Sequence, residues 1–264
     1  MDLFIRQTPR YVDYGVAASC SKNTDHNIRQ VTNLILNIIG SNKKFNTVDV
    51  LRDEISRVRD ADAPWTKATL SKMTKADSVA RETLRYNSVI NRAIFRKVLV
   101  DGVVTDAKLP LPKGTIVSFL SYPVHRNDAN YEDAMSFDPF RFSKLREREA
   151  ASATAVKEET EAASRKESGV GAGVSGAAGT GAKLAFVATS PEYMPFGHGR
   201  HSCPGRFLVD FEMKMIMAYV LANYDLDFPA EYNGKRPENI WLTEAVMPPN
   251  GVKIRLRRRK SAAA

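Results

Sequence analysis

The stretch FGHGRHSCPGR, residues 196–206, places Cys203 in a glycine-rich loop that leads into the most apolar predicted helix of the chain, RFLVDFEMKMIMAYVLANYDLDF. The first N–H groups of a helix lack backbone partners, and together with the helix dipole they favour a negative charge. Arg200 and His201 place further positive or polarising groups beside the sulfur. This position therefore favours a thiolate over a neutral thiol.

The residues around Cys203 leave several roles open. A nucleophilic cysteine needs a base, and His198 and His201 are close in sequence, but no cysteine-hydrolase signature surrounds Cys203. A zinc site needs further Cys or His ligands at suitable spacing, which this sequence lacks. Gly197, Gly199 and Gly205 would let a flat, bulky group approach the backbone. An axial metal ligand fits this loop well, and a buried, inert cysteine is the plain alternative.

The composition indicates a reduced, intracellular globular protein. Two cysteines, Cys20 and Cys203, are too few for a disulfide framework, while 43% hydrophobic residues suffice for a sizeable core. Residues 1–10 lack the apolar region of a signal peptide, and the longest apolar stretch, residues 31–40, is about half a membrane span. We therefore expect no membrane anchor in this chain.

The net charge of +9 does not by itself indicate nucleic-acid binding. Much of the excess lies in the C-terminal stretch KIRLRRRKSAAA, which has no interleaved aromatic residues. We expect no nucleic-acid partner. A basic surface that docks an acidic protein partner remains compatible with this charge.

Apolar spacing predicts helices over residues 27–39, ending at Gly40, and over residues 47–61. The segment 66–88 predicts a short helix and then a longer one that carries Glu82 and Arg85.

The next segments are typical of strands. Residues 93–105 contain Asp101-Gly102, a hairpin signal, and residues 111–127 carry a turn at Pro112-Lys113-Gly114. The C-terminal residues 241–259 predict a second hairpin that turns at Pro-Pro-Asn-Gly.

These patterns predict a mainly α fold with a minor β region over about residues 92–122. Four segments follow from the composition: an irregular lead-in over 1–26, a helical and β segment over 27–145, a low-complexity segment over 146–183, and a C-terminal segment over 184–264. The third segment is rich in Ala, Gly, Ser, Glu and Lys and carries no lasting apolar stripe, so we expect a disordered surface insertion.

Three short motifs, in order, resemble those of the cytochrome P450 haem-thiolate monooxygenases. Phe196, Gly199, Cys203 and Gly205 match the family's Phe-x-x-Gly-x-x-x-Cys-x-Gly loop. ETLR, residues 82–85, is similar to its Glu-x-x-Arg helix, and DPFRF, residues 138–142, resembles its Pro-x-Arg-Phe segment. The residues of these segments are most similar to those of fungal family members that act in secondary metabolism. The resemblance implies the C-terminal portion of the P450 fold.

The resemblance also implies roles for individual residues. Cys203 would be the proximal ligand of the iron of haem b, and its thiolate would favour O–O cleavage. Phe196 would pack near the sulfur, and His201 occupies a position where many members carry an arginine for a haem propionate. Arg96 is a second propionate candidate, and a solvated strand arginine is the alternative. The buried triad would consist of the residues Glu82, Arg85 and Arg141.

The activity implied is insertion of one oxygen atom from O2 into an apolar small molecule of terpenoid type, with electrons from an NADPH-dependent flavin reductase. Family members are usually anchored in the endoplasmic reticulum membrane. Thr24-Asp25 has the residue types of the family's oxygen-site acid–alcohol pair in reversed order, so we assign no catalytic residue.

The chain has about half the length of a full family member, which leaves a second interpretation open: a truncated, non-catalytic remnant without the distal half of the pocket. In either case we expect exposed apolar faces on the helix over residues 27–39 and on the strands, and poor solubility.

Overall fold

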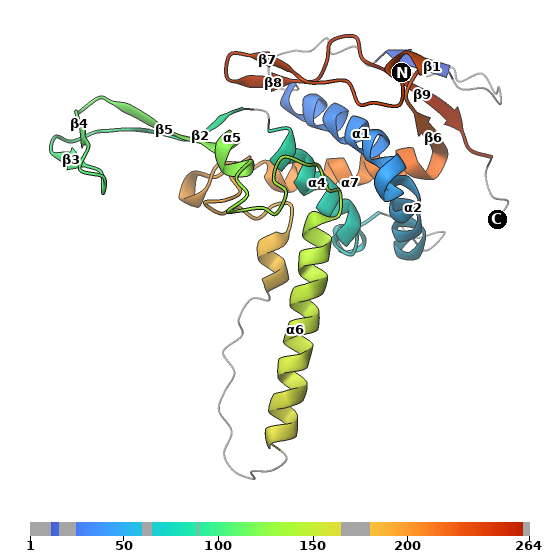
Figure 1. The fold of residues 1–264 in the computed structure, drawn as a ribbon, viewed down its shortest axis with the longest axis horizontal. Helices are drawn as coiled ribbons and strands as arrows, with labels where there is room; N and C mark the ends of the chain where they lie inside the picture. The colour runs from blue at the N-terminus through green and yellow to red at the C-terminus, as the bar shows by residue number, and fades with distance from the viewer. Residues whose placement is uncertain (1–11, 16–24, 60–64, 89, 165–179, 261–264) are drawn as a thin grey trace.

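The computed structural model describes residues 12–15, 25–59, 65–88, 90–164 and 180–260 (Figure 1). The α-helices are α1 Asp25–Phe45, α2 Thr47–Val58, α3 Lys67–Ser71, α4 Thr74–Tyr86, α5 Ser121–His125, α6 Arg141–Ser164 and α7 Arg206–Asn223. The strands are β1 Val12–Gly15, β2 Arg92–Lys97, β3 Val103–Val104, β4 Pro110–Leu111, β5 Ile116–Leu120, β6 Tyr224–Asp227, β7 Ile240–Leu242, β8 Ala245–Met247 and β9 Lys253–Arg258. Short 3-10 helices are η1 Thr180–Leu184, η2 Gly199–His201 and η3 Ala230–Tyr232. The fold is mainly α with small antiparallel sheets, as the sequence predicts.

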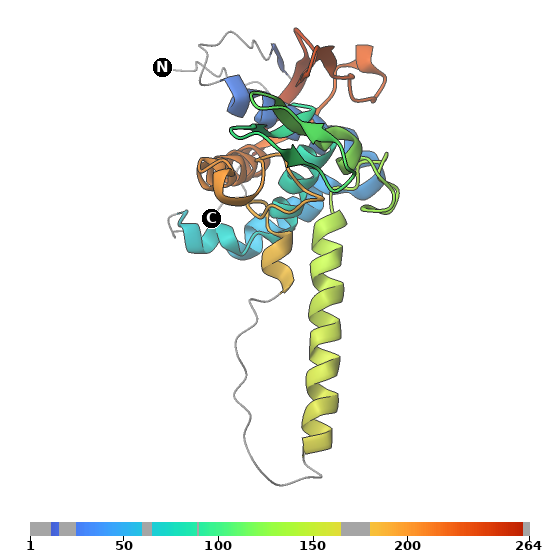
Figure 2. The same ribbon diagram turned by 90° about the vertical axis from the view of Figure 1, so that its left-hand side faces the viewer.

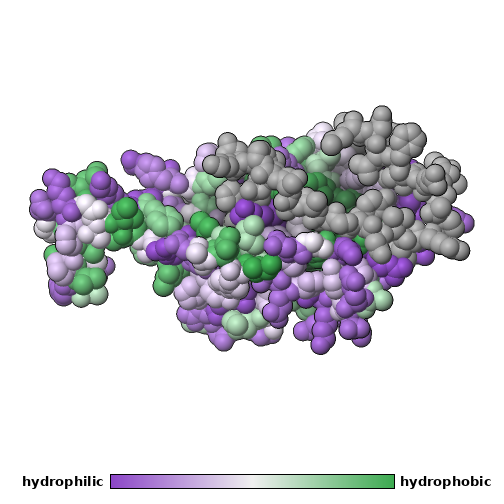
Figure 3. Space-filling view, turned by 90° about the horizontal axis from the view of Figure 1, so that it is seen from above, coloured by the Kyte–Doolittle hydropathy of each residue, from purple (hydrophilic) through white to green (hydrophobic). Residues whose placement is uncertain are grey.

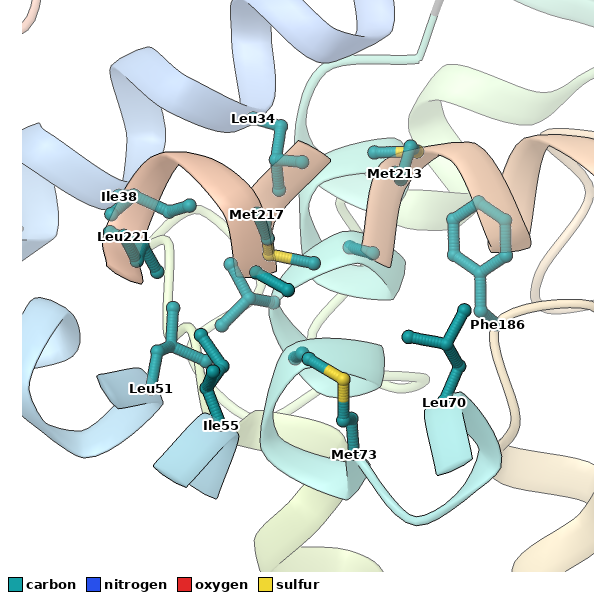
Figure 4. Close-up of a cluster of buried hydrophobic side chains, with 14 of the residues drawn as sticks. Leu34, Ile38, Leu51, Ile55, Leu70, Met73, Phe186, Met213, Met217 and Leu221 are labelled. Carbon is teal, nitrogen blue, oxygen red and sulfur yellow. The ribbon is translucent and has the colours of Figure 1, made fainter. Parts of the chain in front are cut away.

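Helix α7 forms the centre of the main core, and α1, α2, α3 and α4 pack against it (Figures 1 and 4). Met213, Met217 and Leu221 of α7 are fully buried. The side chains that converge on them come from the surrounding helices and from the segment before the cysteine loop: Leu34, Ile38, Leu51, Ile55, Leu70, Met73 and Phe186. Full burial of one such side chain contributes about 1.5–3 kcal/mol, so this cluster holds the helices together.

The prediction of an exposed apolar face on the first helix is wrong. Leu34 and Ile38 lie in the core around α7, while Ile35 and Ile39 pack on the other side of α1 against the buried side chain of Ile254 in β9. Both apolar flanks of α1 are covered because α7 and the C-terminal sheet lie on different sides of it.

The first helix also continues past its predicted end. A Cβ atom at Gly40 would lie 3.0 Å from Cβ of Arg236, so this glycine allows a close approach instead of ending the helix. The helix stops after Phe45, where Asn46 adopts a left-handed conformation with φ 50°. Asparagine is one of the residues that tolerate this region, so Asn46 can separate α1 from α2.

The predicted hairpin at Asp101-Gly102 is wrong, although the β region lies where the sequence places it. Strand β2 pairs with β5 and β3 pairs with β4, so the two antiparallel ladders are nested. The chain reverses between Thr105 and Leu109, where the N–H of Thr105 donates to the carbonyl of Leu109 at 2.9 Å. A two-residue hairpin would forgo the longer β2–β5 ladder and its hydrogen bonds. The predicted turn at Pro112 is present, with the N–H of Thr115 donating to its carbonyl at 3.1 Å.

The C-terminal hairpin is also shorter than predicted. Strands β7 and β8 pair around Thr243 and Glu244, and β9 instead lies between β6 and β1 in a separate sheet. Strand β1 falls within the predicted irregular lead-in, and β6 takes residues that the sequence assigns to the last helix. Pairing on both edges of β9 satisfies its backbone groups, which the predicted hairpin would leave half unpaired.

The low-complexity segment is not disordered at its start, because α6 extends through Ser164 and projects from the body (Figures 1 and 2). Ala, Glu, Lys and Arg are strong helix formers, and they continue a helix whose first turn is fixed by the buried ring of Phe142. Side chains 150–154 are exposed. The end of the predicted insertion is not disordered either, because η1 begins at Thr180. Residues 165–179 lie outside the described residues.

Exposed apolar side chains gather on strands β2, β3 and β5, as predicted, and on the loops that join them (Figure 3). They are Phe95, Leu99, Val100, Val104, Leu109, Ile116, Phe119 and Leu120. A further exposed group lies on α7 and consists of Phe207, Leu208, Phe211 and Tyr219. Among the described helices, none has the length and apolar character needed to cross a membrane.

Candidate functional site

The loop that carries Cys203 is closed by its own backbone. The N–H of Cys203 donates to the carbonyl of Phe196 at 2.8 Å, and the N–H of Ser202 donates to the carbonyl of Gly199 at 3.1 Å. Gly197 and Gly199 have φ angles of 70° and 76°, a region that side chains disfavour. The glycines therefore allow the tight turns that bring Cys203 back to the carbonyl of Phe196.

The thiol of Cys203 is exposed beside an apolar surface. Phe207 and Leu208, in the first turn of α7, expose 53% and 59% of their surface. A Cβ atom at Gly205 would contact Sγ of Cys203 at 3.6 Å. Phe196 is half-buried, and its ring meets that of Phe186 edge to face at 5.3 Å. The loop that carries the sulfur is thus closed by backbone hydrogen bonds, and exposed apolar side chains follow it in the chain.

Of the cationic residues predicted near the haem, two lie in the cysteine loop and one lies on a strand. His201 and Arg200 are exposed within it, in η2. Arg96 is exposed on β2, where Nη1 donates to the carbonyl of Phe95 at 2.8 Å. No hydrogen bond joins Arg96 to the cysteine loop among the described residues. Thr24 and the Asp25 side chain lie outside the described residues.

The structure brings the three predicted triad residues together in the interior. Arg85 donates from Nε and Nη2 to the two carboxylate oxygens of Glu82, both at 2.7 Å. Nε of Arg141 contacts the same oxygens at 3.2 and 3.3 Å. Glu82 and Arg85 are 0% and 1% exposed, so water screens this ion network very little.

The triad also organises the segment between α5 and α6. Arg85 donates to the carbonyls of His125, Ala134 and Ser136, and the N–H of Asp138 donates to Glu82. Burial alone would lower the pKa of Arg85, but its hydrogen bonds to Glu82 and the charge of Glu82 outweigh burial and raise that pKa. The arginine therefore stays charged and can hold these carbonyls.

His125 is a site residue that the sequence analysis missed. Its ring is fully buried, and Nε2 accepts a hydrogen bond from the N–H of Met194 at 2.9 Å. Burial, aided by the charges of Arg85, Arg81 and Arg126, lowers the pKa of His125 to about 3. The neutral ring thus joins the triad region to the start of the cysteine loop. One histidine in a loop gives no sequence signal for this contact.

A second buried ion cluster was also missed. Nζ of Lys214 in α7 lies 2.7 Å from Oδ1 of Asp77 in α4 and 2.7 Å from Oδ1 of Asp210. Arg146 of α6 pairs with Oδ2 of Asp77, and the N–H of Phe186 donates to that oxygen at 3.0 Å. A lysine between methionines in the most apolar helix was the available signal, because such a charge needs a partner when buried.

Comparison with known proteins agrees with the motifs. Residues 43–256 match the family model described as cytochrome P450. The chain is 50% identical to the cytochrome P450 monooxygenase pbrC of Penicillium brasilianum over 231 residues, which are 87% of this chain and 38% of that protein. It is 50% identical to astC of Aspergillus terreus and 44% identical to tenB of Beauveria bassiana, each over 87% of this chain and 39% of the relative. The chain spans about two-fifths of the length of these relatives, and it belongs to the cytochrome P450 family.

Proposed function

We propose that this chain is the haem-ligating part of a monooxygenase that inserts one oxygen atom from O2 into an apolar small molecule. The observation that carries the proposal is the exposed thiol of Cys203 on a loop closed by its own backbone. Family membership supports the reaction class, and the fungal relatives support a role in fungal secondary metabolism. A terpenoid-like substrate is part of the proposal.

The residues around Cys203 fit a haem. A flat macrocycle needs an exposed axial ligand, a surface without bulky side chains beside it, and apolar contacts for its ring. Nothing lies within 4 Å of a Cβ atom built on Gly199, and the exposed side chains of Phe207 and Leu208 supply apolar area. These surroundings support Cys203 as the single protein ligand on its side of the macrocycle, and we propose haem b as the macrocycle.

Each site residue has a role in this proposal. The Cys203 thiolate would bind the iron, and the haem would supply the activation of O2. Phe196 and the loop N–H groups would shape the surroundings of the sulfur, and His201 and Arg96 would pair with propionates. Glu82, Arg85 and Arg141 would hold the segment that supports the loop.

Electrons would come from an NADPH-dependent flavin reductase. The net charge of +9 favours docking to an acidic protein surface. We propose an intracellular location, at the endoplasmic reticulum membrane as is usual for the family.

The test is a reduced carbon-monoxide difference spectrum of the chain supplied with haem, beside Cys203→Ala. We expect the red-shifted Soret band that is peculiar to thiolate ligation, and its loss in the variant. Cys20→Ala is the matched control, because it removes the other cysteine and should keep the band. A folded chain without the band would contradict the proposal and favour a non-catalytic remnant.

A further inference from the structure

The buried carboxylate of Asp77 contacts both flanks of the segment that carries Cys203. On the upstream side, Oδ2 accepts the N–H of Phe186 at 3.0 Å. On the downstream side, Oδ1 accepts Nζ of Lys214 at 2.7 Å. The two contacted residues lie on either side of Cys203 in the chain, so one side chain of α4 joins the beginning and the end of this segment.

The upstream contact continues to the cysteine through packing. Phe186 is fully buried, and its ring meets the ring of Phe196 edge to face. Edge-to-face aromatic pairs add stability beyond that of the area they bury. The carbonyl of Phe196 then accepts the N–H of Cys203 at 2.8 Å. Displacement of Phe186 would therefore move the residue whose carbonyl holds the Cys203 amide.

The downstream contact fixes the helix that follows the loop. Lys214 is 4% exposed, and its ammonium lies between Asp77 and Asp210. A buried charge that loses one partner costs far more than an exposed one, so this contact resists rotation or sliding of α7. Arg146 completes the cluster by pairing with Asp77 and with the carbonyl of Leu184.

We propose that Asp77 is a positioning residue for Cys203. By holding Phe186 and Lys214 at once, it sets the height and orientation of the thiol loop relative to α4. That helix also carries Glu82 and Arg85, so α4 is the common frame for the triad and the ligand loop. The role as a positioner of the haem ligand rests on the proposed function, whereas the effect on the loop does not.

The test compares Asp77→Asn and Lys214→Met with the unaltered chain by amide hydrogen exchange, without haem. An asparagine can accept only one of the two flanking contacts through its single carbonyl oxygen. We expect the Cys203 amide to exchange at least about tenfold faster relative to the core amide of Leu84. The ratio separates a loosened loop from general destabilisation, which would accelerate both amides.

Glu147→Gln is the matched control, because Glu147 pairs with Lys75 of α4 on the surface and does not contact the cysteine loop. It should leave the ratio unchanged. An unchanged ratio in folded Asp77→Asn overturns the proposal. Should that variant fail to fold, Lys214→Met decides for the downstream contact: it removes this contact and leaves Asp77 with Arg146 and Phe186, so an unchanged ratio there overturns the joint hold of Asp77 on both flanks.

A second readout uses the chain supplied with haem. We expect both variants to lose part of the thiolate band, while Glu147→Gln retains it. Absence of this band in the unaltered chain would defeat the proposed function alone, because the hydrogen-exchange result is obtained without haem.

Discussion

His125 and Glu82 show how single buried residues decide the local stability of this protein. Burial keeps the ring of His125 neutral, so that its Nε2 can accept the N–H of Met194, and the carboxylate of Glu82 lies between two arginines. Met194 and Arg141, the second partner of Glu82, lie far away in sequence from the residues that they contact, whereas Arg85 is three positions from Glu82. The motif ETLR therefore predicts a Glu–Arg pair, but its position inside the protein follows from the surrounding segments.

The buried ring of His125 makes stability depend on pH. Its pKa is about 3 in the folded chain and near 6.5 when unfolded, so the unfolded state binds the proton more readily between these values. The free energy of unfolding should therefore decrease as the pH falls below about 6.5, by about 2 kcal/mol at pH 5 from this residue. Urea unfolding between pH 7 and pH 5 measures this loss.

The comparison variant is His125→Gln, which retains an acceptor for the N–H of Met194 and cannot titrate. Its unfolding free energy should depend less on pH over the same range. Parallel curves for the two proteins would rule out His125 as the cause.

Removal of the Glu82 charge should be strongly destabilising. In Glu82→Gln two buried guanidinium groups lose their shared carboxylate, and breaking a buried pair costs about 3–5 kcal/mol. Denaturant unfolding should show a loss of this order. Glu147→Gln, which removes a surface pair, should cost less than about 1 kcal/mol. Equal effects of the two substitutions would contradict a buried network.

At the scale of elements, local periodicity predicts α1, α2, α4 and α7 well, but it predicts strand pairing poorly. It also misses α6, and α5 lies in a segment predicted to be strand-like. The spacing of apolar residues in α2, α4 and α7 reflects the face that each helix buries. Strand partners depend instead on which distant segments meet, as with β9 between β6 and β1. Gly40 also shows that distant contacts decide such features, because this glycine allows the close approach of Arg236 and does not end the helix.

The outer part of α6 should be dispensable for stability. Its exposed side chains at 150–154 contribute little burial, and the inner turns hold the core contacts. The double substitution Ser152→Ala, Thr154→Ala should change the unfolding free energy by less than about 0.5 kcal/mol, because both side chains are exposed and surface substitutions rarely cost more. Phe142→Ala, in the first turn, should cost about 3–5 kcal/mol. A large loss in Ser152→Ala, Thr154→Ala would contradict this and assign a packing role to these exposed turns.

At the scale of the whole molecule, the exposed apolar residues on the strands and on α7 should cause self-association. Leu99 and Ile116 are 71% and 69% exposed, and contiguous surfaces of this kind promote association. The chain should elute from gel filtration at an apparent mass that increases with concentration. The double variant Leu99→Lys, Ile116→Glu should shift towards the monomer without loss of stability. Val98→Lys is the contrasting variant, because Val98 is buried and a charge there should destabilise the fold.

A monomer at all concentrations in the unaltered chain would contradict this prediction.

The expectation of exposed strands followed from the sequence and agrees with the structure, whereas the matching expectation for α1 was wrong. The sequence of α1 is apolar on more than one side, and only the positions of α7 and β9 determine that both sides are covered.

The sequence by itself determined the family, the order of the helices that form the main core, and the residues of the cysteine loop and the triad. These features are local, because motif spacing and apolar periodicity depend on residues a few positions apart. Tertiary structure alone decided which strands pair, how α1 is buried, and that His125 and Asp77 support the loop of Cys203. Those outcomes depend on contacts between residues tens to more than one hundred positions apart, whose burial and partners no short stretch of sequence records.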